Sequence, residues 1–200
     1  MSSVSQPAGR RERNKQQKLV RITAAASELF AEYGVDEVTT QQIAEKADVG
    51  TGTVFLYAKT KGELLLLVQN ANYSEALARG RTDAENVSDV LDAVMAIIGP
   101  IVECNRTQID NGRTYLREMV FGNPEEPHHA EALTIVGQTE EAIATVMRRG
   151  SRIEEAEAEA LAHVVSAIMF LAMAATVNIS RTVDEIMGEI RAQVAALLPH

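Results

Sequence analysis

Apolar residues recur every three or four positions along most of this 200-residue chain, and this spacing constrains the fold more than any other feature. The C-terminal segment shows it most plainly, with an uninterrupted stripe of Val183, Ile186, Met187, Ile190, Val194, Leu197 and Leu198. Such a stripe lies along one face of an α-helix. Aromatic residues make up only 4% of the chain, so few strands are expected. The sequence therefore predicts an all-α protein.

Composition and cysteine content narrow the class of protein. The chain is 46% hydrophobic and 24% charged, which is typical of a globular protein. Its single cysteine, Cys104, cannot form an intrachain disulfide, as in proteins of a reducing cytosol. The longest apolar run, residues 164–177, is shorter than the roughly 20 residues that span a bilayer. Residues 1–9 lack the apolar core of a signal peptide. We expect a cytoplasmic protein without a membrane partner.

Charge is distributed unevenly along the chain. The net charge is −9, yet residues 1–61 hold nine Lys or Arg and seven Asp or Glu, a net of +2, which leaves −11 for the rest. The excess of positive charge is concentrated in a short segment that contains Arg10, Arg11, Arg13, Lys15, Lys18 and Arg21. A solvated tail is one interpretation of this segment, and a basic arm that contacts nucleic acid is the other.

Three helices are predicted between residues 15 and 57. The first covers about residues 15–33 and ends at Gly34, a typical C-terminal cap. Thr39 or Thr40 begins a second, short helix, and Thr51 caps a third that reaches about Tyr57. Between the last two helices, Asp48 is expected to take a left-handed backbone conformation.

Two short helices joined by a tight turn form either an ordinary helical hairpin or a DNA-binding helix-turn-helix. The second requires a small residue where the helix axes approach and apolar side chains that seal the joint. Residues 40–54 meet both needs, with Ala44 as the small residue. The sealing side chains are Ile43, Ala47, Val49 and Val54.

Residues 21–64 resemble the N-terminal domain of the TetR family of transcriptional regulators. The resemblance lies in four stretches, residues 25–34, 39–47, 52–57 and 61–64, about a quarter of the chain. Phe55 stands where the family often has Tyr, and Ala58 where it often has Phe. The resemblance implies a flexible basic arm at residues 1–17, a three-helix helix-turn-helix domain at residues 18–61, and a larger helical bundle at residues 62–200 for ligand binding and dimerisation.

The resemblance also implies a set of residues that contact double-stranded DNA. Hydroxyl, amide and aromatic groups on the short helices are expected at base edges or phosphates, and arginines of the arm at the backbone or minor groove. The expected residues are Arg10, Arg11, Arg13, Thr40, Gln41, Thr51, Gly52, Thr53, Phe55, Tyr57 and Lys61.

Residues 62–200 carry further helical segments. Gly99 and Pro100 interrupt one at residues 87–104 and are expected to kink or split it, opening room for a ligand. Ser151 with Glu154, and Thr182 with Glu185, form capping-box patterns. Inner faces of this domain predict a mainly apolar small-molecule effector, with Met95, Tyr115, Met119, Phe170 and Met173 as ligand-binding residues. The two C-terminal helices are either the interface of a homodimer or buried core helices of a monomer, and we expect the homodimer, with Val164, Ile168, Ile186, Ile190 and Val194 at the interface.

Other chemistries lack a supporting pattern. His128 and His129 are adjacent and so point apart, while His163 and His200 have no ligand spacing to them, which argues against a metal site and for surface histidines. No cofactor motif is present, and no acid-base pair or activated nucleophile indicates an enzyme. Two functions stay open: a ligand-responsive DNA-binding repressor, and a helical small-molecule-binding protein without operator binding.

Overall fold

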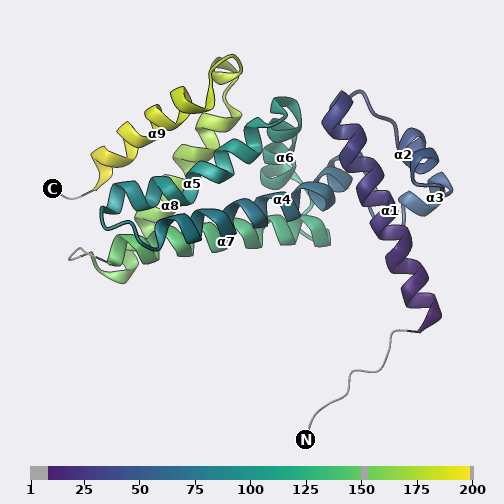
Figure 1. Cartoon of the computed structure of the whole chain (residues 1–200), viewed down its shortest axis with the longest axis horizontal. Coiled ribbons are helices and arrows are strands. Elements are labelled where there is room, and N and C mark those ends of the chain that lie inside the picture. The colour runs from purple at the N-terminus through teal and green to yellow at the C-terminus, as the bar shows by residue number, and fades with distance from the viewer. Residues whose placement is uncertain (1–8, 150–152, 199–200) are drawn as a thin grey trace, which may run out of the picture.

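The computed structural model describes residues 9–149 and 153–198, and this part of the chain forms nine α-helices and one 3-10 helix with no strand. The predicted all-α fold is confirmed (Figure 1). The helices are α1 Arg10–Tyr33, α2 Thr40–Lys46, α3 Thr51–Val54, α4 Lys61–Ala84, α5 Val90–Arg106, α6 Ile109–Phe121, α7 Pro127–Arg148, α8 Glu155–Ala174, the 3-10 helix Thr176–Asn178, and α9 Val183–Leu197.

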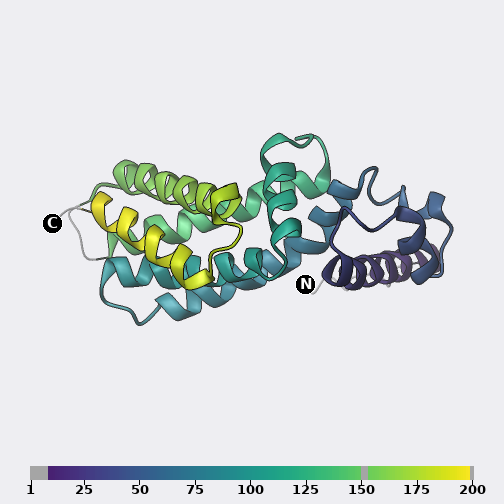
Figure 2. The ribbon, with the colours of Figure 1, turned by 90° about the horizontal axis from the view of Figure 1, so that it is seen from above.

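The molecule is elongated, with two bodies at opposite ends of its long axis. Helices α1 to α3 form the head, and α5 to α9 form a bundle (Figures 1 and 2). Helix α4 begins beside the head and runs through the bundle, where it packs most extensively on α5 and α7. Because one continuous helix belongs to both bodies, any tilt of α4 changes the position of the head relative to the bundle.

The head has the local geometry that its sequence predicts. Thr39 caps α2 in a full capping box with Gln42. Asp48 has φ of 51°, the left-handed turn conformation, and is the one non-glycine residue with positive φ among those described. Ala44 and Val54 are almost completely buried where the two short helices meet. These contacts confirm helix-turn-helix packing rather than an open hairpin.

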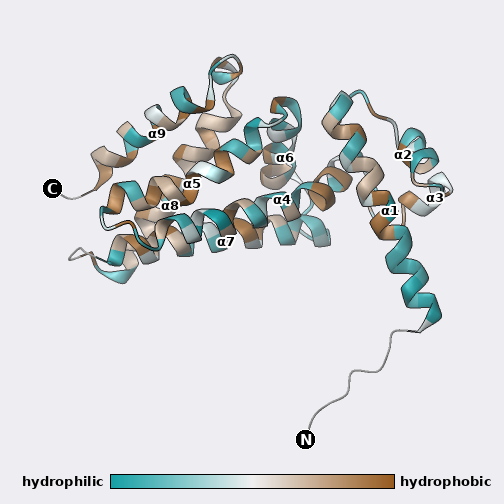
Figure 3. Ribbon diagram, in the orientation of Figure 1, coloured by the Kyte–Doolittle hydropathy of each residue, from teal (hydrophilic) through white to brown (hydrophobic). Residues whose placement is uncertain are grey.

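Two helices begin at different residues than the sequence predicts. Helix α1 begins at Arg10, five residues before the expected start, so the basic segment from residue 10 onward is helical rather than a flexible arm (Figure 3). The apolar residues with helical spacing begin only at Leu19. The first turns of α1 are polar, so their sequence gives no periodic signal of a helix. Helix α3 is capped by Gly50, and Thr51 is its first helical residue.

Helix α5 is not split at Gly99 and Pro100 and continues to Arg106. Proline removes the N–H that would pair with the carbonyl of Ala96, at a cost to the helix. Burial of the neighbouring Ile97, Ile98, Ile101 and Val102 offsets that cost. Of the two predicted capping boxes, Thr182 with Glu185 is confirmed at α9. Ser151 lies outside the described residues.

Candidate DNA-binding surface and ligand cavity

The recognition helix α3 presents a polar surface to solvent. Thr51 and Gly52 are exposed, Thr53 is half-buried, and Val54 anchors the helix in the core. A side chain added at Gly52 would meet no atom within 4 Å, so this part of the surface is open. Phe55 and Leu56 follow with exposed side chains, and Leu56 is 82% exposed. A large apolar group exposed next to short hydroxyls suits contact with base edges and thymine methyls.

A groove of about 1030 Å³ lies between α3 and the first turns of α1. The phenol of Tyr57 holds its two walls together, because its hydroxyl donates a hydrogen bond to the carbonyl oxygen of Lys15 at 2.9 Å. Four cations line the groove, together with Thr53 and Leu56. They are Arg10, Arg11, Lys15 and Lys18. This arrangement places four cations, a type of group that binds phosphate, beside α3, the helix expected to contact bases.

The predicted DNA contacts do not all lie in this groove. Lys61 is half-buried, and its Nζ donates to the carbonyl oxygens of Val35 at 3.0 Å and Asp36 at 2.9 Å. It therefore fastens the loop between α1 and α2, an interaction that competes with the predicted phosphate contact, and that contact stays a prediction. Gln41 is exposed and donates to Glu45. Arg13 is exposed on α1 but is not among the groove residues. Lys15, Lys18 and Leu56 were missed by the residue-level prediction, although the charge pattern contained the first two.

The bundle encloses an apolar cavity of about 60 Å³ between α4, α5, α6, α7 and α8. Of the residues predicted to bind ligand, Tyr115, Met119, Phe170 and Met173 line it, while Met95 is buried elsewhere in the core and is not part of its wall. The other lining residues are Tyr73, Ile101, Leu116, Ala132, Ile135, Val136, Thr139, Ser166 and Met169.

Two stacked phenols form one wall of the apolar cavity. The rings of Tyr73 and Tyr115 lie with centroids 4.2 Å apart. Burial raises the pKa of each phenol well above its ordinary value, so both are neutral near pH 7. Tyr115 donates from its hydroxyl to Oδ1 of Asn70 at 2.9 Å. The wall of the cavity is thereby joined to a buried polar network on α4.

That network continues from the cavity to the head. Asn70 donates from Nδ2 to the carbonyl oxygen of His128 and to Oε2 of Glu131, both at 2.9 Å. The ring of His128 then donates from Nε2 to the carbonyl oxygen of Tyr57 at 3.0 Å. Tyr115, Asn70, His128 and Tyr57 thus form a continuous path, called here the relay, from the apolar cavity to the turn after α3.

A second connection joins the head to α6. Asn111 is buried, and its Oδ1 accepts from the N–H of Val35 at 2.7 Å while its Nδ2 donates to the carbonyl oxygen of Phe30 at 2.8 Å. An ion pair between Lys59 and Glu126 adds a third link, and its hydrogen bond raises the pKa of Lys59. Sequence reasoning missed these residues, because partners 67 to 81 positions apart leave no local pattern.

The surface of α8 holds apolar side chains that the chain itself does not cover. Val164 is 40% exposed, Leu171 is 66% exposed, and Ile168 is half-buried. Ile186, Ile190 and Val194, which were predicted at a dimer interface, are completely buried within the protomer and are corrected to core residues. The apolar stripe of α9 faces α5 and α8, so only the α8 part of the predicted surface is free to meet another chain.

Helix α8 is also the one described helix whose length and composition would allow it to cross a membrane. The apolar run at residues 164–177 is too short by itself to cross a membrane. Helix α8 is long enough because it begins nine residues earlier, at Glu155. A core helix of a globular protein passes the same test, and α8 packs against α7 and α9.

The histidines are not all on the surface. His129 is buried with both ring nitrogens unpartnered among the described residues, which corrects the predicted surface position. His163 is exposed beside Glu140. Within residues 9–149 and 153–198, no group of three His, Cys, Asp or Glu side chains lies close enough to hold a metal ion. His200 lies outside the described residues.

An exposed recognition helix on a three-helix head, backed by a helical bundle with an apolar cavity, defines a helix-turn-helix transcriptional regulator. Residues 22–68 match the family of bacterial regulatory proteins described as the tetR family. The head of the protein is therefore similar in sequence to the N-terminal domain of TetR-family transcriptional regulators.

Solved structures share the fold over nearly the whole chain. A TetR transcriptional regulator from Rhodococcus sp. RHA1 has a TM-score of 0.70 and 17% identity, covering 92% of this chain and 97% of that one. The repressor FadR of Thermus thermophilus, solved in complex with lauroyl-CoA, has a TM-score of 0.70 and 21% identity, covering 90% and 92%. The fatty acid degradation regulator FadR of Bacillus halodurans has a TM-score of 0.67 and 16% identity, covering 98% and 100%.

A curated relative is similar in sequence over part of its length. The fatty acid metabolism regulator protein of Bacillus subtilis (strain 168) is 27% identical over 86 residues. The match covers 43% of this chain and 44% of that protein, so it spans less than half of the relative.

Proposed function

We propose that this protein is a homodimeric repressor that binds a pseudopalindromic operator and is released by a fatty acyl effector. The observation that carries the proposal is the relay, because it connects an apolar ligand cavity to the recognition helix. Residues 18–61 then act as the DNA-binding unit, and residues 62–200 as the ligand-binding and dimerisation unit.

Exposed side chains on the head support the proposal that the protein binds an operator. The cationic groove beside α3 offers groups that can bind phosphate, and the exposed or half-buried Thr51, Thr53 and Phe55 are proposed to contact base edges. A two-fold dimer presents two recognition helices, so the half-sites are expected about one helical turn, roughly 34 Å, apart. An intact polar recognition helix favours this function over a small-molecule-binding protein without operator binding.

The apolar lining of the bundle cavity supports an acyl effector. Ligand pockets commonly measure about 300–1,000 Å³, so a cavity of about 60 Å³ has to widen around a long chain. Met119, Met169 and Met173 line it, and unbranched thioethers change shape at low cost. Widening displaces Tyr115, the first member of the relay. Effector binding then favours an arrangement of the heads that fits the operator less well. Three relatives agree with this effector class. Two are named as regulators of fatty acid metabolism or degradation, and the third was solved in complex with lauroyl-CoA.

Selection from random DNA duplexes followed by effector titration tests the proposal. We expect an enriched pseudopalindrome whose complex dissociates on addition of lauroyl-CoA. Met119→Trp, which fills the cavity, should abolish that response and leave DNA affinity without effector intact. Met187→Trp is the matched control, because Met187 is half-buried on α9 away from the cavity. Failure to enrich any sequence contradicts operator binding, and a complex that no acyl compound dissociates contradicts the effector class.

A further inference from the structure

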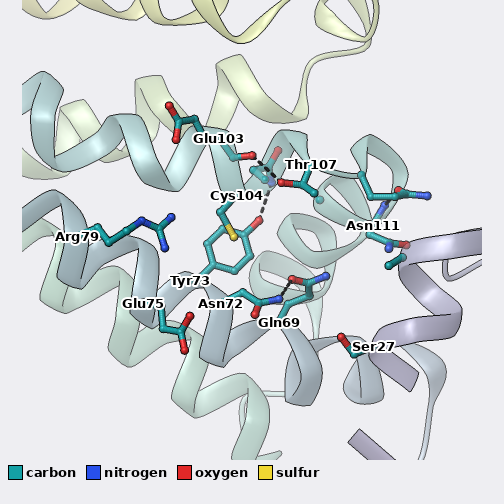
Figure 4. Close-up of a pocket in the computed structure, with 14 residues that line it drawn as sticks. Ser27, Gln69, Asn72, Tyr73, Glu75, Arg79, Glu103, Cys104, Thr107 and Asn111 are labelled. Atoms are coloured by element: carbon teal, nitrogen blue, oxygen red, sulfur yellow. Dashed lines mark hydrogen bonds between the residues drawn. The ribbon is translucent and has the colours of Figure 1, made fainter. Parts of the chain in front are cut away.

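A second cavity, called here the junction cavity, lies where the head meets the bundle. It measures about 420 Å³ and is bounded by α1, α4, α5 and the segment that leads into α6 (Figure 4). Its wall includes exposed residues such as Asn72 and Thr107, so it opens to solvent. Tyr73 is the one described residue that lines both this cavity and the apolar cavity, and its buried ring lies between them as a wall. The junction cavity is therefore a site of its own, and its volume falls in the range that small-molecule sites occupy.

One buried side chain in the wall of the junction cavity lacks a partner. Asn105 is 1% exposed, and its Nδ2 donates to the hydroxyl oxygen of Tyr73 at 2.8 Å. Its Oδ1 accepts no hydrogen bond from any described residue. A buried carbonyl oxygen without a donor is costly and uncommon in native proteins. An N–H group of a ligand in the cavity would supply the missing donor.

The charged side chains in the same wall favour a cation. Glu75 and Arg79 lie on α4 and Glu103 lies on α5, so two negative charges and one positive charge sum to −1 (Figure 4). Both carboxylates are exposed, and neither forms an ion pair with a described residue. Burial raises the pKa of the Cys104 thiol to about 11, so this group adds no charge near pH 7. Unpaired carboxylates attract a cation and repel carboxylates and phosphates.

A ligand that carries ammonium groups meets both requirements. Its N–H groups can donate to Oδ1 of Asn105 and form charge-assisted hydrogen bonds with Glu75 and Glu103. Uncharged amides and hydroxyls fill much of the remaining wall, which suits a short polar ligand. They come from Ser27, Gln69, Asn72, Thr107, Gln108 and Asn111.

We propose that the junction cavity is a binding site for a small organic amine, separate from the effector site in the apolar cavity. This inference goes beyond the proposed function, because it requires neither an acyl effector nor an operator. It rests on the unpaired amide oxygen of Asn105 and on the excess of carboxylates in the wall.

The position of the junction cavity gives a bound amine a direct effect on the head. Asn111 lines the cavity while holding the N–H of Val35 and the carbonyl oxygen of Phe30. Ser27 and Ala31 contribute to the same wall from α1. An amine in this cavity would contact both bodies of the molecule where they join, and its binding would favour one arrangement of the head over others.

Calorimetric titration of the full chain at low salt with three probes tests this inference. The probes are the four-carbon compounds putrescine, butanediol and succinate, which are a diamine, a diol and a dicarboxylate. We expect the diamine to bind wild type at least about fivefold more tightly than the diol, and succinate to bind least, because the wall has a net negative charge.

A pair of charge variants separates a built site from general attraction to an acidic chain. Glu75→Gln removes one carboxylate from the wall and should weaken diamine binding about threefold or more. Asp83→Asn is the matched control, because Asp83 is an exposed carboxylate of α4 outside both cavities. It changes the net charge of −9 by the same amount and should bind the diamine like wild type.

A second pair of variants tests the cavity itself. Asn72→Trp fills the junction cavity from an exposed position on α4 and should abolish diamine binding. Ser74→Trp, exposed on the same helix but outside both cavities, should bind the diamine like wild type. Thermal unfolding checks that each variant is folded, and the charge variants test the site if a tryptophan variant is not.

Three results would overturn the inference. They are a diamine that binds wild type no better than the diol, Glu75→Gln that weakens binding no more than Asp83→Asn, and Asn72→Trp that binds the diamine like wild type. Each of these results leaves the proposed function in place, because operator selection and acyl effector titration test that function separately.

Discussion

His128 donates a hydrogen bond from its ring Nε2 to the carbonyl oxygen of Tyr57, across 71 positions of sequence. His128 is the second residue of α7, and Tyr57 follows the recognition helix. This single contact therefore joins the start of α7 in the bundle to the turn after α3 in the head, and Asn70 links it in turn to Tyr115.

Removing this contact should weaken the coupling between effector and DNA. In His128→Leu we expect the factor by which effector lowers DNA affinity to shrink several-fold, because the relay then ends at Asn70. Affinity for the effector alone should stay within about twofold, since His128 does not line the apolar cavity. Fluorescence anisotropy with and without effector measures the coupling. His163→Leu, at an exposed histidine remote from the head, is the control, and an unchanged coupling in His128→Leu would show that the relay carries no signal.

Replacement of Asn111 by Leu should destabilise the junction between head and bundle. The N–H of Val35 would be left buried without its acceptor, which costs about 1–3 kcal/mol. The carbonyl of Phe30 keeps the N–H of Gly34 as a donor, so it adds less. Urea unfolding followed by circular dichroism measures the loss. Asn72→Leu, at an exposed asparagine on α4, should change the free energy of unfolding by less than about 0.5 kcal/mol. Equal stability of the two variants would contradict a structural role for Asn111.

DNA affinity should fall steeply as the salt concentration rises, because the cations of the groove displace counterions from the DNA phosphates. Each phosphate contact contributes about 0.9 to the slope of log affinity against log salt, so Lys15→Ala and Lys18→Ala should each lower that slope by about one. Lys61→Ala should leave the slope unchanged and lower thermal stability, because Lys61 holds the carbonyls of Val35 and Asp36. A lower slope in Lys61→Ala would instead support the predicted phosphate contact.

Thr53→Ala should alter which sequence is preferred rather than the salt slope. Thr53 lies on α3 and lines the groove, and its uncharged hydroxyl can hydrogen-bond a base edge without adding a phosphate-binding charge. Selection from random duplexes with wild type and variant measures the preference at individual operator positions. An unchanged preference together with uniformly weaker binding would assign Thr53 to the phosphate backbone.

Dimerisation should depend on the uncovered face of α8. Val164→Asp with Leu171→Asp places charges where apolar groups are exposed, and we expect monomers in sedimentation velocity with loss of specific DNA binding. Val120→Asp, at an exposed apolar residue of α6, should remain dimeric. A dimeric double variant would locate the interface elsewhere. Aspartate at Ile190 would not test dimerisation, because this side chain lies in the protomer core.

Short-range information in the sequence determined most of the helices and the head. The spacing of apolar residues defines helix faces, and caps such as Thr39 and Thr182 act within one turn of backbone. The left-handed turn at Asp48 and the small Ala44 are likewise local requirements of the helix-turn-helix. Four of the five residues predicted to bind ligand line the apolar cavity, because the periodicity of a helix shows which of its faces points inward.

Tertiary structure alone decided which partner each face meets. The stripe of Ile186, Ile190 and Val194 marks a buried face, and only the packed bundle shows that α5 and α8 of the same chain cover it. Packing also keeps α5 helical through Pro100, against the local preference. The relay and the Asn111 contacts join residues far apart in sequence. Their partners are chosen by the arrangement of whole helices, and no spacing within one segment encodes that choice.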